Sequence, residues 1–262
     1  MRAVALHPDV LLVTSAIWQT NCAIVRSGKE VFVIDSPVLP DELDALASLL
    51  EQAGYPEPSG LLATHGDWDH LLGRIAFPGL SLGCAESTAA RMAAAPGLAQ
   101  RELRAFDEQH LIERSRPLAL GAVQALPVPG RCGIGEQELE LHDARGHTED
   151  GMAIWVPWAG VLIAGDYLST AEIPSLEGPV DAYVATVERL SSLAPSAAYA
   201  IPGHGPVLDA ERAARTIEED LGYLRALGER GVEAELPAGR SGAVQRARHA
   251  RNAARVEAGA HP

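Results

Sequence analysis

The residues best suited to chemistry lie together in the short segment His65-Gly66-Asp67-Trp68-Asp69-His70. Its imidazoles and carboxylates are the ligand types that proteins offer to zinc, iron or manganese. Packed so closely, these groups would repel one another or shift each other's pKa values unless a cation neutralised them. In an extended loop, alternation would point His65, Asp67 and Asp69 to one side, and a following turn would bring His70 round to them. The segment therefore predicts a metal site.

Three more ligand-type residues lie at the ends of short strand-like segments, each directly after a glycine: Gly146-His147, Gly165-Asp166 and Gly203-His204. Glycine in this place is typical of a sharp turn or of a close approach by the backbone to something else. Loops at the ends of strands are also where binding residues gather on a rigid scaffold. We therefore expect these residues to join the first segment in one pocket.

The elements that must position these residues come in two similar rounds, each with strands first and helices after. Apolar, β-branched runs predict strands at residues 10–14, 22–26, 31–34, 60–64, 80–84, 123–127, 138–142, 152–156, 160–164 and 197–201. Helical patterns cover residues 40–53, 86–110 (interrupted at Pro96), 181–193, 208–228 and 241–258. Two such rounds predict an α/β (α+β) fold of two packed sheets with helices outside, an αβ/βα sandwich. We expect a single domain over residues 1–262, with a helical tail from about residue 208.

The ordered motifs His-x-Asp-x-Asp-His, Gly-His, Gly-Asp and Gly-His resemble the signature of the metallo-β-lactamase superfamily. The resemblance runs from about residue 10 to residue 206, and it implies the same sandwich with a two-metal site at one edge. The implied ligands are His65, Asp67 and His147 for the first metal, Asp69, His70 and His204 for the second, and Asp166 as a bridge between them. Asp35, at the end of an early strand, matches the family's structural aspartate, expected to hold the ligand loop by hydrogen bonds. The form Thr-His-x-x-Trp-Asp-His is similar to the glyoxalase II branch.

One position departs from the family pattern, because Asp67 stands where a second histidine is usual. A carboxylate adds negative charge and moves the preference of the site from zinc toward iron or manganese. A carboxylate at this position is similar to the pattern of the flavodiiron branch, whose metal is iron. Two divalent ions are expected, with zinc as the first choice and iron or manganese open. The alternative is a degraded first site, with a single metal at Asp69, His70 and His204.

The resemblance implies a metal-dependent hydrolase that uses a metal-bound hydroxide to cleave a small activated acyl substrate, namely a thioester, a lactone or an ester. Asp69 or Asp67 would orient the hydroxide and carry its proton. Tyr167 and Trp68 are candidate substrate contacts, and packing is the alternative for both. The rival function is an iron-dependent oxidoreductase of the same fold, such as a sulfur dioxygenase. A β-lactamase, a nuclease and a catalytically silent binder are less favoured.

The composition narrows the partners. The formal net charge of −14 disfavours nucleic acid, and no run is apolar enough for a membrane helix, so we expect a small-molecule substrate and a cytoplasmic protein, with a homodimer left open. Cys22, Cys84 and Cys132 form no disulfide framework. The tail, residues 240–262, carries five arginines (Arg240, Arg246, Arg248, Arg251 and Arg255) against a single Glu257. We expect it to be a solvated helix on the acidic body, and an anion-binding arm, with His249 and Asn252 on one face, is the alternative.

Overall fold

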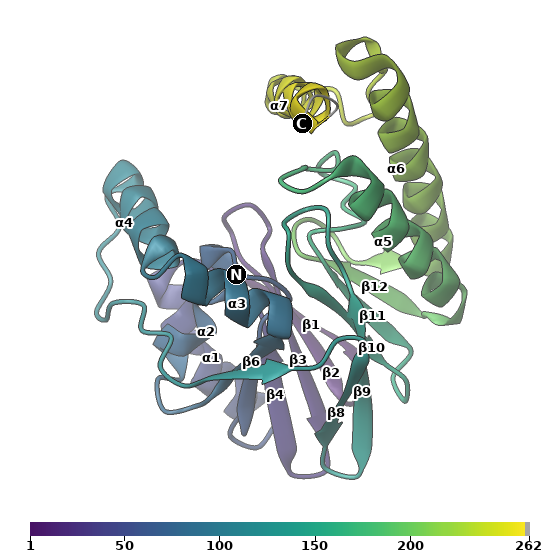
Figure 1. Ribbon diagram of the computed structural model, residues 1–262. Coiled ribbons are helices and arrows are strands. Elements are labelled where there is room, and N and C mark those ends of the chain that lie inside the picture. Colours follow the sequence, from purple (N-terminus) through teal and green to yellow (C-terminus); the bar gives the residue numbers. More distant parts are fainter. Residues whose placement is uncertain (260–262) are drawn as a thin grey trace.

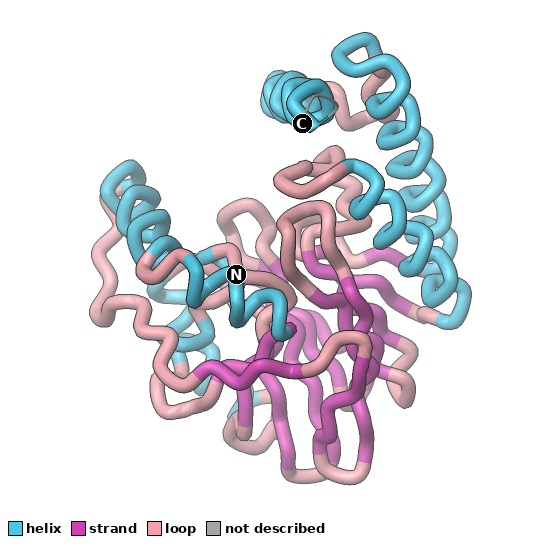
Figure 2. The backbone as a smooth tube through the Cα atoms, in the orientation of Figure 1, coloured by secondary structure: helices cyan, strands magenta, loops and turns pink. Residues whose placement is uncertain are grey.

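Two β-sheets form the centre of the molecule, and helices cover the outer face of each (Figures 1 and 2). The computed structural model describes residues 1–259. The first sheet consists of β1 (Arg2–His7), β2 (Val10–Thr14), β3 (Asn21–Ser27), β4 (Glu30–Ile34), β5 (Gly60–Leu62), β6 (Leu82–Ala85) and β7 (Val123–Leu126), in that order. The second, in the order β13-β12-β11-β10-β9-β8, consists of β8 (Gly130–Ile134), β9 (Gln137–Asp143), β10 (Met152–Val156), β11 (Val161–Gly165), β12 (Tyr199–Pro202) and β13 (Leu208–Asp209).

The helices divide between the two outer faces. Those of the first sheet are α1 (Pro40–Gln52), α2 (Gly73–Ala76), α3 (Glu86–Ala94) and α4 (Leu98–His110), and those of the second are α5 (Val180–Leu193), α6 (Ala210–Arg230) and α7 (Ala243–Gly259). This arrangement confirms the predicted αβ/βα sandwich. No helix of the described part of the chain is long and apolar enough to cross a membrane.

The alternation of side chains along the strands explains the layers. In β2, Val10 and Leu12 pack between the sheets, whereas Leu11 and Val13 pack under the helices of the first face. Successive residues of a strand point to opposite faces, so a strand buried on both sides reads as a continuous apolar run. A third apolar cluster, which includes Leu162 of β11, joins the second sheet to α5, α6 and α7.

Most of the predicted elements are present within a few residues, including the break at Pro96 between α3 and α4. The prediction missed β1, β8 and β13. The first is an edge strand with mostly exposed side chains, and the second contains two glycines, so neither shows a clear apolar pattern. The helix predicted from residue 208 begins at Ala210, because the Asp209 side chain accepts a hydrogen bond from the amide of Arg212 and caps it. Residues 260–262 of the predicted domain lie outside the described residues.

Candidate metal centre

The predicted ligands come from loops at the ends of strands in both sheets, and these loops meet at one edge of the sandwich. His65 follows β5, His147 follows β9, Asp166 follows β11 and His204 follows β12. An isolated β-bridge between Thr20 and His204 ties the two sheets together at this edge. The meeting point of the sheets therefore carries the predicted cluster.

Two of the glycines before the ligands are required by close packing. A Cβ atom at Gly203 would overlap the Oδ1 atom of Asp166, so this position must be glycine for the carboxylate to lie where it does. Gly146 has a φ of 122°, and a Cβ there would overlap the backbone of Tyr183 at the start of α5. The predicted role of these glycines, a close backbone approach, is thus confirmed.

The first group of ligands consists of His65, Asp67 and His147, whose ligand atoms lie within 4.8 Å of one another. The Oδ2 atom of Asp67 is 3.6 Å from the Nε2 atom of His65 and 3.6 Å from that of His147. Asp67 therefore directs one oxygen toward both imidazoles, as a ligand of a shared ion would.

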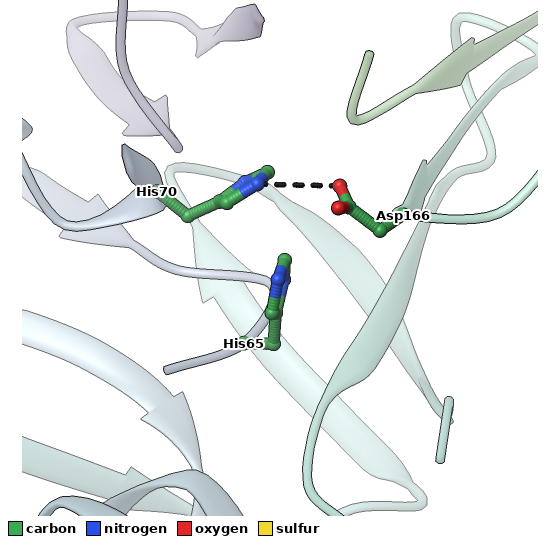
Figure 3. A group of neighbouring side chains, drawn as sticks. All are labelled: His65, His70 and Asp166. Carbon is green, nitrogen blue, oxygen red and sulfur yellow. Dashed lines mark ion pairs between the residues drawn. The ribbon is translucent and has the colours of Figure 1, made fainter. Parts of the chain in front are cut away.

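The second group consists of Asp69, His70 and His204, which satisfy the same distance limit. Asp166 lies between the two groups: its Oδ1 is 3.2 Å from Nε2 of His70, and its Oδ2 is 3.3 Å from Nε2 of His147 and from Nε2 of His204. Figure 3 shows the side chains of His70 and Asp166 directed toward each other, with the ring of His65 beside them. From this position Asp166 would contact an ion in either group.

Each of the four histidines has its Nδ1 atom occupied by the protein. The partners are Thr64 Oγ1 for His65 at 3.1 Å, Asp35 Oδ2 for His70 at 3.0 Å, the Ser175 carbonyl oxygen for His147 at 2.9 Å and Thr20 Oγ1 for His204 at 3.3 Å. A carbonyl oxygen can only accept, so Nδ1 of His147 carries a proton, whereas Nδ1 of His70 faces Asp35 as an ion pair. The opposite nitrogen, Nε2, is directed at the centre and is the atom that would bind a cation, which is how proteins orient metal-binding histidines.

The chemistry of the centre fits divalent cations. Within residues 1–259, the Nε2 atoms of His65, His70 and His147 and the Oδ1 atom of Asp166 are buried and have no hydrogen-bond partner. Buried polar atoms are normally satisfied, and cations bound by the two ligand groups would satisfy all four. Three carboxylates facing four imidazoles are the oxygen and nitrogen ligands that zinc, iron and manganese accept.

The histidines and carboxylates of the cluster stabilise each other's charged forms and so shift each other's pKa values. Burial alone would lower the pKa of His147, but the carboxylates of Asp166 and Asp67 outweigh it and raise that pKa to about 9. Burial would raise the pKa of Asp166, yet His204 and His70 hold it well below its usual range. The carboxylates are therefore ionised at neutral pH and ready to bind cations.

Asp35 and Ser36 hold the segment that carries most of the ligands. Oδ1 of Asp35 accepts from the amide of Thr64 at 2.8 Å, and Oδ2 accepts from the Thr64 hydroxyl at 2.9 Å. Ser36 donates its hydroxyl to the Asp69 carbonyl at 3.1 Å and accepts from the Leu72 amide at 3.0 Å, which fixes the 3-10 turn Trp68–His70. The structural role predicted for Asp35 is confirmed.

The structure corrects the prediction for Tyr167. Its side chain is buried, and its hydroxyl accepts a hydrogen bond from the amide of His147 at 3.0 Å. Tyr167 thus supports the backbone of His147 from within the core and does not face a substrate. Trp68 is half-buried and packs its ring 5.7 Å from Trp18 and 4.8 Å from Phe106, so its role as a substrate contact stays a prediction.

The arginine-rich tail is more deeply engaged than predicted. Arg240 is buried, pairs with Asp220 at 2.6 Å and donates to the carbonyl oxygens of Ser169 and Glu172. His249 and Asn252, which share one helical face as predicted, are buried against Tyr223 and do not form an anion-binding surface. The tail therefore holds the loop that follows Asp166.

Two further residues at the centre were not anticipated. Arg91 on α3 donates from Nη1 to Oδ1 of Asp67 at 2.8 Å and to Oδ1 of Asp150 at 2.9 Å. Arg91 lies in a helical stretch without any motif, so nothing in its neighbourhood marked it. Asp150 is close to His147 in the sequence, and this proximity was the only available indication.

Comparisons with known proteins agree with this geometry. The model of the metallo-beta-lactamase superfamily matches residues 16–204. A metallo-beta-lactamase family protein from Thermus thermophilus superposes with a TM-score of 0.68 and 22% sequence identity, covering 86% of this chain and 82% of that one. The structure of TTHA1623 in a di-iron-bound form superposes with a TM-score of 0.60 and 25% sequence identity, covering 78% of this chain and 97% of that one.

Among curated proteins, the metallo-beta-lactamase type 2 of Bacillus sp. (strain 170) is 31% identical over 81 residues, which are 29% of this chain. The matched part spans only 32% of that relative's length. The family match, in contrast, covers most of the chain and includes every candidate ligand of the centre. On this evidence the chain belongs to the metallo-beta-lactamase superfamily.

Proposed function

We propose that this protein is a binuclear metal-dependent hydrolase that cleaves a small activated acyl substrate, such as a thioester, a lactone or an ester. The observation that carries the proposal is the common orientation of His65, His70, His147 and His204, each with Nδ1 engaged by the protein. Their Nε2 atoms converge with three carboxylates in overlapping groups of potential ligands. Two divalent cations held there would lower the pKa of a water molecule toward about 7 and polarise a substrate carbonyl.

Within this mechanism Asp69 is the residue we assign to hold the attacking water and accept its proton. Its Oδ2 atom lies 3.3 Å from Nε2 of His204, at the centre of the cluster. Burial opposes ionisation, but His70 and His204 lower the pKa of Asp69, so it is ionised and able to accept a proton. Asp67 is less suited to this task because Arg91 already binds one of its oxygens.

The surroundings of the centre favour substrates without strong negative charge. Burial and the nearby carboxylate of Asp67 raise the pKa of Glu102. Glu177, on the opposite loop, lies 3.9 Å from Arg91 and is half exposed. Trp18, Trp68 and Phe106 provide an apolar surface beside His204. We therefore expect neutral lactones and esters to be better substrates than penicillins, which carry a carboxylate.

The test begins with the metal content of protein purified without added metal. Protein loaded with zinc is then assayed on a neutral lactone, an aryl ester, a glutathione thioester and a penicillin. The proposal expects about two metal ions per chain and hydrolysis of at least one of the first three, abolished by a chelator. Protein that holds metal but hydrolyses none of them contradicts it.

A second candidate function, an iron-dependent oxidoreductase such as a sulfur dioxygenase, is supported by two observations. Asp67 supplies a carboxylate where histidine is usual, and hard oxygen ligands suit iron. TTHA1623, the relative described above, was crystallised in a di-iron-bound form. Iron in the purified protein, together with oxygen uptake on a persulfide and no hydrolysis, would favour this function.

A further inference from the structure

The two carboxylate oxygens of Asp67 have different surroundings. Oδ1 accepts a hydrogen bond from Nη1 of Arg91 at 2.8 Å. Oδ2 faces the centre and lies 3.6 Å from the Nε2 atoms of His65 and His147. Oδ1 is therefore held by Arg91, and Oδ2 is the oxygen directed at the centre.

Arg91 is itself held in place by a second carboxylate, that of Asp150. Its side chain is 27% exposed, and Nη1 also donates to Oδ1 of Asp150 at 2.9 Å. Asp150 is only 1% exposed, and its Oδ2 accepts from the amide of Gly66 at 3.0 Å. Asp150 thus ties the guanidinium to the backbone between His65 and Asp67. The three side chains and this turn form one connected unit.

Charge explains why a carboxylate here needs such a partner. Asp67 adds a negative charge to a cluster that already contains Asp69 and Asp166. A guanidinium at hydrogen-bond distance offsets that repulsion, and its planar, fixed geometry restricts the rotation of the carboxylate. Without it, Asp67 is free to bind through both oxygens or to turn toward solvent, since its side chain is 25% exposed.

We infer that Arg91, fixed by Asp150, is a positioning residue that makes Asp67 a single-atom ligand of the first metal site. Asp67 and Arg91 together then take the place of the histidine that is usual here. The inference rests on the metal centre of the proposed function, but it concerns metal binding and not the reaction.

The experiment is a double-mutant cycle of Arg91→Met and Asp67→His, read by metal binding. Cobalt or zinc is titrated into metal-free protein in competition with a chelator, which gives a separate affinity for each of the two ions. We expect Arg91→Met to weaken the first ion by roughly 10–100-fold, the range for residues that orient a ligand. The second ion, at Asp69, His70 and His204, is the internal control and keeps its affinity.

In the Asp67→His background, we do not expect Arg91→Met to weaken binding of the first ion. A histidine with Nε2 on the metal has no acceptor for Arg91, so Arg91→Met there leaves the first affinity unchanged or raises it. Arg91→Lys, which keeps the charge, should retain more affinity than Arg91→Met. Arg104→Met, a substitution of an exposed arginine on α4, is the matched control and should change neither affinity.

Three results would overturn the inference. One is an unchanged or higher first affinity in Arg91→Met, which would mean that Arg91 competes with the ion for Asp67. Another is a loss of first-ion affinity from Arg91→Met that is equally large in the Asp67→His background. The third is a wild-type protein that binds one ion only. A wild-type protein that binds two ions and hydrolyses acyl substrates, but whose first-site affinity does not depend on Arg91, would leave the proposed hydrolase standing while this inference fails. If Arg91→Met does not fold, Arg91→Lys is compared in the wild-type and Asp67→His backgrounds, and an equal loss of first-site affinity in both overturns the inference.

Discussion

The Nδ1 atom of His147 lies 2.9 Å from the main-chain carbonyl oxygen of Ser175, and this contact connects the metal centre to the C-terminal helix. Ser175 belongs to the loop after β11. The amide of Leu176 in this loop donates to Asn252 Oδ1 at 3.1 Å, and Asn252 Nδ2 donates to the carbonyl of Pro174 at 2.7 Å. A buried side chain of α7 therefore fixes the carbonyl that orients a candidate ligand.

The first prediction follows from this chain of contacts. Replacing Asn252 with alanine leaves the buried amide of Leu176 and the carbonyl of Pro174 without their partner, which should lower the free energy of unfolding by about 1–3 kcal/mol. The Ser175 carbonyl then loses its fixed position, and we expect the first metal to bind roughly tenfold more weakly. Denaturant unfolding and chelator competition measure the two effects.

Arg251→Ala is the matched control, since Arg251 is exposed on the same helix. It should leave both the unfolding midpoint and the metal affinity as in the wild type. A loss of stability in Asn252→Ala without any change in metal affinity would show that the loop orients His147 without help from α7.

The residues that carry the centre were readable from the sequence because the ligand types follow strand-like segments in a fixed order. Asp35 was readable for the same reason, as a carboxylate at a strand end. Arg91 was not, and Asn252 was considered only for an anion-binding face, because each lies within a helix where polar residues are common. Their importance depends on which loop the helix packs against, and this is decided by tertiary structure.

The same limit applies to Tyr167. Its position directly after Asp166 suggested a residue facing the substrate, but the Tyr167 side chain is buried in the core, with its ring 4.6 Å from the ring of Tyr183. The expected helix of the arginine-rich tail is present as α7, with Arg246, Arg251 and Arg255 exposed, but composition does not show partners and so did not predict the burial of Arg240. Arg240 finds its partners in Asp220 and in two backbone carbonyls.

The second prediction concerns Asp35. In Asp35→Asn, an amide replaces one oxygen that now accepts from Thr64 and lies 3.0 Å from Nδ1 of His70. An amide group cannot accept the proton of Nδ1, so His70 loses the partner that fixes its orientation. We expect the second metal to bind roughly 10–100-fold more weakly, measured by chelator competition. Asp44→Asn, an exposed change on α1, should have no effect, and equal behaviour of the two variants would contradict the assignment.

The third prediction is a pH dependence of the stability gained from metal. The neighbouring carboxylates of His147 overcome its burial and raise its pKa to about 9, from an unfolded value of about 6.5. A base whose pKa rises on folding stabilises fully below the unfolded value and loses that stabilisation as the pH rises through the folded value. Metal-free protein should therefore lose stability between about pH 6.5 and pH 9. Metal-loaded protein should not, because its imidazoles are already deprotonated.

Melting temperatures with and without metal, taken from about pH 6 to about pH 9, measure this difference. The difference in melting temperature between metal-loaded and metal-free protein should widen as the pH rises. In metal-free His147→Asn the decline toward high pH should be shallower than in the wild type. A gap that stays constant or narrows would mean that the imidazole does not carry a proton in the metal-free protein.

The last prediction concerns Trp18, in the loop between β2 and β3. Its ring is 49% exposed and packs edge-on against Trp68 and Phe106, with the ring of His204 6.5 Å away. The contacts of its loop with Gly205 and His204 are made by Gln19 and Thr20, so its side chain is free to contact a substrate. We expect Trp18→Ala to raise KM for an apolar ester or lactone by roughly tenfold, for a lost contact of about 1.4 kcal/mol, with metal content and kcat nearly unchanged.

Leu111→Ala, which removes an exposed apolar side chain at the end of α4, is the control and should leave KM as it is. A fall in metal content in Trp18→Ala would instead make the residue part of the support of His204.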